Sequence, residues 1–134
     1  MRVMADSNIL IAAMVFPKSL AASAFRLILC SHRLVLCSYV VDETIEVIRR
    51  KFPTLESAAE QFLSDLSYEY FYTPSMIEPG LFQIRDPKDY PVLYSAVKSN
   101  ADLLVTGDKD FSDVEVENLL ILTPGEFIAR FMNH

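Results

Sequence analysis

Five short apolar runs, separated by stretches with helical spacing, constrain the fold of this chain more than any other feature. The runs at residues 103–105 and 119–122 contain no polar residue, which is typical of strands that are covered on both faces. Strands that alternate with helices across short links favour a mostly parallel sheet between two helical layers. We therefore predict an α/β fold, a three-layer α/β/α sandwich with a mostly parallel five-stranded sheet.

The element boundaries follow from apolar spacing, prolines and turn formers. Strands are expected at residues 2–5, 33–37, 69–72, 102–106 and 119–122. Helices are expected at residues 12–30 with a break at Pro17, and at residues 40–51, 55–66 and 89–100. A length of 134 residues without repeats or a long linker predicts a single domain over residues 1–134.

The charge balance limits the partners that the chain can accept. Eighteen acidic against 12 basic residues give a formal net charge of −6, which argues against a broad basic surface for nucleic acids or anionic membranes. No stretch approaches the roughly 18 apolar residues that a membrane span needs. Asp6 and Lys18 interrupt what would otherwise resemble a secretory signal. We expect a cytoplasmic protein without a membrane partner. A function that involves nucleic acid must explain the excess of acidic residues.

Two aspartates directly follow predicted strands. Asp6 comes after the first strand, and Asp108 follows the fourth strand across Thr106 and Gly107. In open parallel sheets, ligands bind beyond the carboxyl ends of the strands. Either aspartate alone is also a common helix cap or turn former. Their occurrence after two strands favours a functional site at one edge of the sheet.

Helical geometry at 100° per residue places two further acids. Asp89 falls within the apolar arc of the helix at its position, where it serves either as a cap or as a carboxylate of the site. Asp86, three residues earlier, is expected at the outer rim. Glu43 borders the apolar arc of its helix, whereas Glu46 lies opposite that arc. We expect Glu43 to reach the sheet edge and Glu46 to face solvent.

Carboxylates gathered at one edge raise one another's pKa unless a cation compensates them. The four expected there are Asp6, Glu43, Asp89 and Asp108. Oxygen ligands without an organised set of His and Cys favour Mg²⁺ or Mn²⁺ over Zn²⁺. Cys30 and Cys37, with His32 between them, are one ligand short of a structural zinc site and are expected to be core thiols. Without the four acids the net charge is −2, so much of the negative excess would belong to the site.

Five segments in this order resemble the motifs of the PIN-domain family. They read V-M-A-D-S-N-I-L, S-Y-V-V-D-E-T-I-E-V-I-R-R, R-D-P-K-D-Y-P-V-L-Y-S-A-V, N-A-D-L-L-V-T-G-D-K-D-F and I-L-T-P-G-E-F, and the resemblance extends over residues 2–127. The second motif contains two glutamates, so the choice of Glu43 over Glu46 depends on the helix face. The resemblance points to the branch of toxins from bacterial and archaeal toxin–antitoxin pairs.

The resemblance implies a set of site residues and partners. The catalytic and metal-binding acids would be Asp6, Glu43, Asp89 and Asp108, supported by Asn8 and Thr106 and by the peripheral acids Asp86 and Asp110. The family implies a divalent-metal ribonuclease that is usually a homodimer and is often silenced by a small antitoxin protein. From their positions near the motifs, the candidates for phosphate contacts are Arg85, Lys88 and Lys109.

The predicted chemistry is cleavage of single-stranded RNA by a water that Mg²⁺ or Mn²⁺ activates, leaving a 5′-phosphate and a 3′-hydroxyl. The two histidines, His32 and His134, lie outside the motifs, so attack by the ribose 2′-hydroxyl is not expected. A D-x-D phosphatase is not favoured because Asn8 stands in place of the second aspartate. The alternative from another class is a catalytically inactive PIN-like scaffold or RNA-binding module.

Overall fold

Five parallel strands form one sheet in this computed structural model, which describes residues 1–132. The strands are β1 (Arg2–Ala5), β2 (Arg33–Cys37), β3 (Glu69–Phe71), β4 (Leu103–Val105) and β5 (Leu120–Leu122). Their order is β3-β2-β1-β4-β5, and every neighbouring pair is parallel. The prediction of a mostly parallel five-stranded sheet is confirmed, and each predicted strand lies within one residue of its observed ends.

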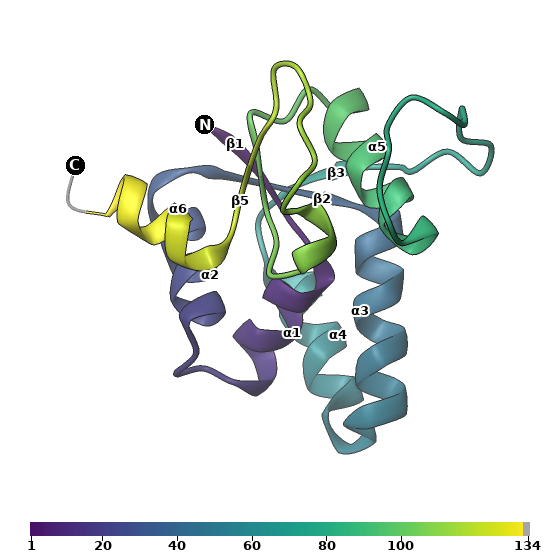
Figure 1. The fold of residues 1–134 in the computed structure, drawn as a ribbon. Helices are drawn as coiled ribbons and strands as arrows, with labels where there is room; N and C mark the ends of the chain where they lie inside the picture. Colours follow the sequence, from purple (N-terminus) through teal and green to yellow (C-terminus); the bar gives the residue numbers. More distant parts are fainter. Residues whose placement is uncertain (133–134) are drawn as a thin grey trace.

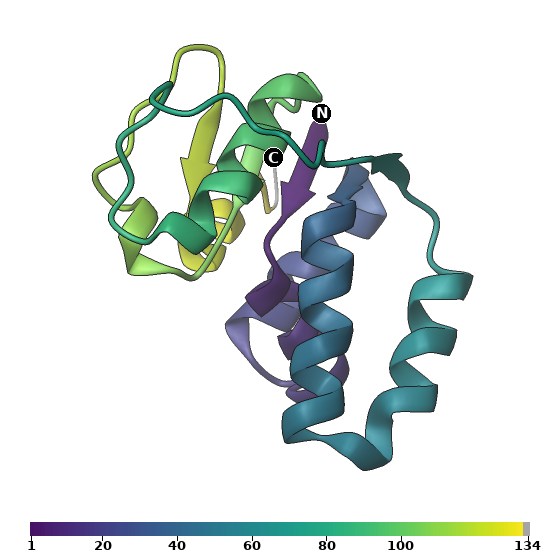
Figure 2. The same cartoon turned by 90° about the vertical axis from the view of Figure 1, so that its right-hand side faces the viewer.

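Helices cover both faces of this sheet. They are α1 (Ser7–Val15), α2 (Leu20–Ser31), α3 (Ser38–Lys51), α4 (Glu56–Asp65), α5 (Tyr90–Lys98) and α6 (Pro124–Phe131), with 3₁₀ turns η1 (Pro53–Leu55), η2 (Pro87–Asp89) and η3 (Lys109–Phe111). α2 packs against α6 on one side of the sheet, and α3 lies beside α5 on the other (Figure 1). Figure 2 shows α3 and α4 side by side, projecting beyond the sheet. The three-layer α/β/α sandwich is therefore confirmed.

Burial explains the apolar runs of the sequence. β1 and β4 occupy the middle of the sheet, and Val3, Met4 and the three residues of β4 have no exposed surface. Strands covered on both faces need apolar side chains at consecutive positions. β3, at one edge, has only partly buried or exposed residues, which fits its weaker apolar pattern.

Two helices differ from the prediction. The first helix begins at Ser7 and not at residue 12, because Asp6 acts as its N-cap and accepts a hydrogen bond from the Ser7 N–H. α6 was not predicted, although Thr123 and Glu126 form a reciprocal capping box around Pro124 in the first turn. Both differences arise from local capping bonds, which apolar periodicity does not register.

The remaining expectations concern cysteines and membrane spans. Cys37 is buried, but Cys30 is exposed, so the prediction of two core thiols was wrong for Cys30. Within residues 1–132, no single helix is both long and apolar enough to cross a membrane. Only α1 and α2 taken together meet the length and composition of a span, and they are bent by 102° relative to each other.

The strand order creates a switch point between β1 and β4. From β1 the chain continues to β2 on one side, whereas from β4 it continues to β5 on the other. Where neighbouring strands lead in opposite directions, their carboxyl ends leave a crevice that binds ligands in open α/β sheets. The residues that follow β1 and β4 are therefore placed where a functional site is expected.

Candidate metal centre

Asp6 lies at the bottom of this crevice. The pairing of Ala5 with Val105 sets Asp6 beside the end of β4, and the Asp6 N–H donates to the Val105 carbonyl at 3.1 Å. The side chain of Thr106 donates to Asp6 Oδ2 at 2.7 Å, and the Ser7 N–H donates to Oδ1 at 2.7 Å. Asp6 is only 4% exposed. The carboxylate is thus fixed in direction by the first residue of α1 and by the residue that follows β4.

Burial controls the ionisation of Asp6. Removal from water raises its pKa to about 6, although the hydrogen bonds from Thr106 and Ser7 oppose this rise. The negative charges of Glu43 and Asp108 also contribute to this raised pKa. Within the part of the chain that the structure describes, no ion pair compensates the charge of this carboxylate.

Asn8 and Thr106 hold together the loops that follow β1 and β4. The Gly107 N–H donates to Asn8 Oδ1 at 3.1 Å, and the Asp108 N–H donates to Thr106 Oγ1 at 3.1 Å. Asp108 Oδ1 in turn accepts the Asp110 N–H at 2.9 Å, which begins the turn η3. These side chains therefore set the position of Asp108 relative to Asp6.

The two glutamates of α3 have different surroundings. The Ser7 hydroxyl donates to Glu43 Oε1 at 2.5 Å, so Glu43 reaches the start of α1 next to Asp6. The side chain of Glu46 is 60% exposed and lies 3.9 Å from the Arg50 guanidinium, one turn along the helix. The structure places Glu43 at the sheet edge and Glu46 in solvent, as the helix geometry predicted.

Asp89 stands in the turn η2, directly before α5. Its side chain makes no capping bond, so the alternative of a simple helix cap does not hold. Its Oδ2 atom is buried and has no hydrogen-bond partner among residues 1–132. Burial, followed by the charges of Asp108 and Asp6, raises the pKa of Asp89 to about 7. A buried carboxylate oxygen that accepts no hydrogen bond is available as a ligand for a cation.

A second, outer group of acids shares Asp89. Carboxylate oxygens of Asp86, Asp89 and Asp110 lie within 4.8 Å of one another. Asp6, Glu43 and Asp108 form no group as tight among the described residues. Asp89 therefore connects the inner acids to the outer ones. The donor set consists of carboxylate oxygens alone, which fits a hard divalent cation such as Mg²⁺ or Mn²⁺.

The basic residues near the acids are of two kinds. Arg85 lies 3.8 Å from Asp110 and 3.5 Å from Asp113, so its charge already compensates neighbouring acids. Lys88 and Lys109 are exposed, and neither forms an ion pair within residues 1–132. Lys88 and Lys109 are thus the two described basic residues near the acids that can pair with an anionic ligand without first breaking an ion pair.

Two residues at the site were not predicted from the sequence. Ser7 connects Asp6 to Glu43, which a pattern of acids alone does not show. The half-buried Tyr39 has its pKa raised by burial and then by the charges of Glu43 and Asp89, so its hydroxyl stays protonated. Tyr39 lies four residues before Glu43, so the two side chains share a helix face, and this spacing could have predicted that Tyr39 lies near the site.

Comparisons with known proteins agree with this architecture. A crystal structure of VapBC2 from Rickettsia felis, bound to a DNA fragment from their promoter, contains a similar chain with a TM-score of 0.67. The two chains share 16% sequence identity, and the match covers 92% of this chain and 98% of that one. No curated protein matches. The model of the PIN domain matches residues 2–110, and this chain therefore belongs to the PIN-domain family.

Proposed function

We propose that this protein is a divalent-metal ribonuclease that cleaves single-stranded RNA by hydrolysis. PIN domains are generally nucleases, which supports the broader class. The observation that carries the proposal is the pair Asp6 and Asp89, two crowded carboxylates with raised pKa at the β1–β4 crevice, of which Asp89 has a buried oxygen without a partner. A divalent cation would satisfy both.

The proposed catalytic and metal-binding residues are Asp6, Glu43, Asp89 and Asp108. Asp6 and Asp108 would hold one ion, and Glu43 with Asp89 would serve a second. Bound Mg²⁺ or Mn²⁺ supplies an activated water and neutralises charge on the scissile phosphate. Asn8, Thr106, Asp86 and Asp110 support the acids through the contacts described above. The hydrogen bonds that the Thr106 hydroxyl donates to Asp6 and the Asp110 N–H donates to Asp108 orient these two carboxylates in advance, which reduces the cost of reorganisation during the reaction.

Few cations are available to hold the RNA backbone. Lys88 and Lys109 flank the acids without ion pairs and are the proposed phosphate contacts, together with Arg85 once a phosphate replaces its acidic partners. His32 lies at the end of α2 and packs against Phe127 and Phe131, away from the acids. His134 lies outside the described residues. Hydrolysis that leaves a 5′-phosphate is therefore favoured over a route through the 2′-hydroxyl.

We further propose that the chain is the toxin of a toxin–antitoxin pair. Its fold matches a chain of VapBC2, a complex crystallised with promoter DNA, and this supports a cognate antitoxin as partner. A homodimer is part of the same proposal. Light scattering of the purified protein, alone and with a candidate antitoxin, tests both assemblies.

The test of the activity is incubation of the purified protein with a mixed pool of single-stranded RNA, with Mn²⁺ or with EDTA. We expect cleavage only with the metal, products with 5′-phosphates, and no cleavage by a folded Asp6→Asn variant. Products with cyclic 2′,3′-phosphates would contradict the mechanism. RNA binding without cleavage by the parent protein would favour the inactive RNA-binding module.

A further inference from the structure

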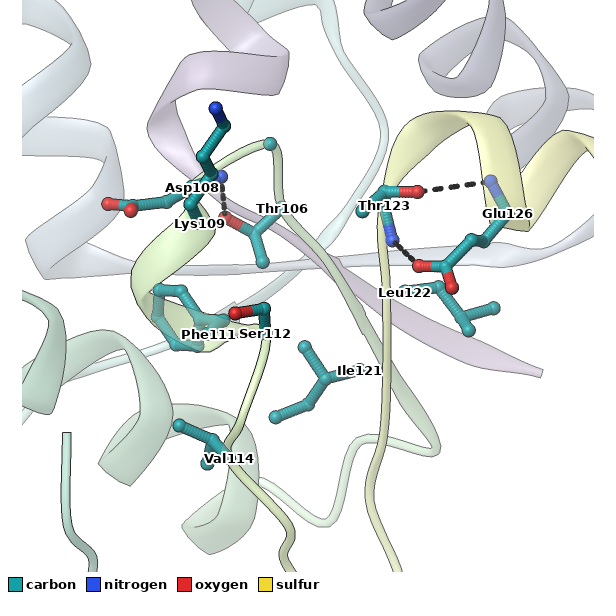
Figure 3. A pocket seen from close by; sticks show the side chains of 11 residues that line it. Thr106, Asp108, Lys109, Phe111, Ser112, Val114, Ile121, Leu122, Thr123 and Glu126 are labelled. Atoms are coloured by element: carbon teal, nitrogen blue, oxygen red, sulfur yellow. Dashed lines mark hydrogen bonds between the residues drawn. The ribbon is translucent and has the colours of Figure 1, made fainter.

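A hollow of about 310 Å³ opens next to the inner acids, beyond the carboxyl ends of β4 and β5 (Figure 3). Its walls come from the loop after β4, the turn η3, β5 and the start of α6. The volume is at the small end of the range for ligand pockets, so the hollow suits one small ligand and not several nucleotides at once. The function proposed above does not assign a role to this hollow.

The lining of the hollow combines apolar and polar side chains. Phe111, Val114, Ile121 and Leu122 provide apolar surface, and Ser112 and Thr123 provide hydroxyl groups. A planar heteroaromatic ring buries its faces against apolar side chains and satisfies its edge with polar groups. The chemistry of the wall thus matches a nucleobase.

The charges around the hollow argue against a phosphate as its occupant. Of the charged residues in the lining, Asp108 and Lys109 point their charged groups away from the hollow (Figure 3), whereas Glu126 keeps its carboxylate beside Thr123 at the edge of the hollow. The start of α6 is also closed to an anion, because the Glu126 N–H donates to Thr123 Oγ1 and the Thr123 N–H donates to Glu126 Oε1. A neutral ring with N–H donors fits this surrounding better than an anion does.

The hollow and the inner acids share one wall. Thr106, Gly107 and Asp108 line the hollow, and Thr106 also donates to the buried Asp6. Figure 3 shows the carboxylate of Asp108 pointing away from the hollow, with Ser112 on one side of the hollow and Ile121 and Leu122 on the other. The loop of residues 106–108 thus borders both the acids and the hollow, and an RNA strand bound at the acids would pass beside this loop.

We propose that this hollow binds the base of the nucleotide next to the scissile phosphate and determines which base the protein accepts there. The inference extends the proposed ribonuclease function, on which it depends. It adds Ser112, Val114, Ile121 and Thr123 as residues that set specificity without touching the reacting phosphate.

The test compares two exposed positions that receive the same bulky side chain. Ser112→Trp places an indole at the mouth of the hollow, and Glu117→Trp, outside the lining, is the matched control. Each variant, once shown to be folded, cleaves an RNA pool with randomised bases in Mn²⁺, and the cut sites are sequenced. We expect Ser112→Trp to reduce the base preference at one flanking position by about tenfold, the size of a single pocket contact. Glu117→Trp should keep the parent's preference.

Failure of this inference is distinguishable from failure of the ribonuclease proposal. If all three proteins cut RNA with the same base preference at every position, the hollow does not bind a base and the nuclease proposal stands. If the parent cuts no RNA, NMR of the Val114 and Ile121 methyl groups during titration with the four nucleosides decides the matter. Base-dependent shifts, lost in Ser112→Trp, would support the site, and unchanged spectra would overturn it.

Discussion

Asp6 shows how one residue serves both the fold and the site. Its carboxylate caps α1 through the Ser7 N–H, and it also accepts the Thr106 hydroxyl from across the crevice. Its position after an apolar strand was evident in the sequence. Its partners were not, because Thr106 lies 100 residues away along the chain. A strand pattern predicts where an acid lies, whereas its ionisation depends on distant groups.

The raised pKa values predict how stability changes with pH in the metal-free protein. The pKa of Asp6 is raised from 3.8 to about 6, so between these values the native state binds more protons than the unfolded state. Stability should therefore fall as pH rises through this window, by on the order of 3 kcal/mol from Asp6. The raised pKa of Asp89, about 7, should also make stability fall as pH rises. We expect a smaller contribution from Asp89 than from Asp6, because Asp89 is more exposed and solvent screens its charge.

Urea unfolding in EDTA at pH 4.5 and 7.5 measures this dependence. The Asp6→Asn variant, which cannot titrate at this position, should lose less stability between the two pH values than the parent. Equal losses in the two proteins would show that Asp6 is ionised at both pH values, contrary to the burial described above.

The two glutamates of α3 provide a matched comparison within one helix. Glu43→Gln removes a negative charge next to Ser7 and Asp6, so Mn²⁺ affinity and cleavage should both fall, cleavage by about tenfold for each 1.4 kcal/mol of lost transition-state stabilisation. Glu46→Gln changes an exposed side chain and should alter stability by less than about 0.5 kcal/mol with activity unchanged. Assays at low and saturating Mn²⁺ separate metal affinity from catalysis. An inactive Glu46→Gln beside an active Glu43→Gln would reassign the site.

At the scale of elements, the residues that directly follow β1 and β4 determine the geometry of the site. Thr106 ends the apolar run of β4, donates to Asp6 and accepts the Asp108 N–H, so it couples the ends of β1 and β4. Strand positions followed from apolar runs because burial on both faces leaves a clear pattern. The early start of α1 and the existence of α6 were missed because capping bonds, and not apolar spacing, determine them.

Thr106→Val tests this coupling. Valine keeps the shape of the buried side chain but leaves the Asp108 N–H and Asp6 Oδ2 without their partner. We expect a loss of about 1–3 kcal/mol in the free energy of unfolding, the usual cost of unsatisfied buried polar groups. Thr54→Val, at an exposed position in η1, is the control and should change stability by less than about 0.5 kcal/mol. A neutral Thr106→Val would mean that Asp108 is positioned by other contacts.

At the scale of the whole molecule, the strand order brings together acids that are far apart in sequence. Asp6 and Asp108 follow the two strands at the switch point, Glu43 approaches from α3, and Asp89 approaches from the turn before α5. The alternation of strands and helices predicted the parallel sheet, and the positions of Asp6 and Asp108 directly after strands were also evident in the sequence. Ser7 and Tyr39 were not, since the role of a hydroxyl group depends on which acid the fold places beside it.

The central claim is that these acids form a binding site for a divalent metal, and the free energy of unfolding as a function of Mn²⁺ concentration tests it most directly. Binding to the native state alone predicts a gain of about 2.7 kcal/mol at a hundredfold excess over the dissociation constant. The Asp6→Asn variant should lose most of this gain, and Glu46→Gln should retain it. A parent protein whose stability does not change with Mn²⁺ or Mg²⁺, or an Asp6→Asn variant that gains as much as the parent, would contradict the assignment.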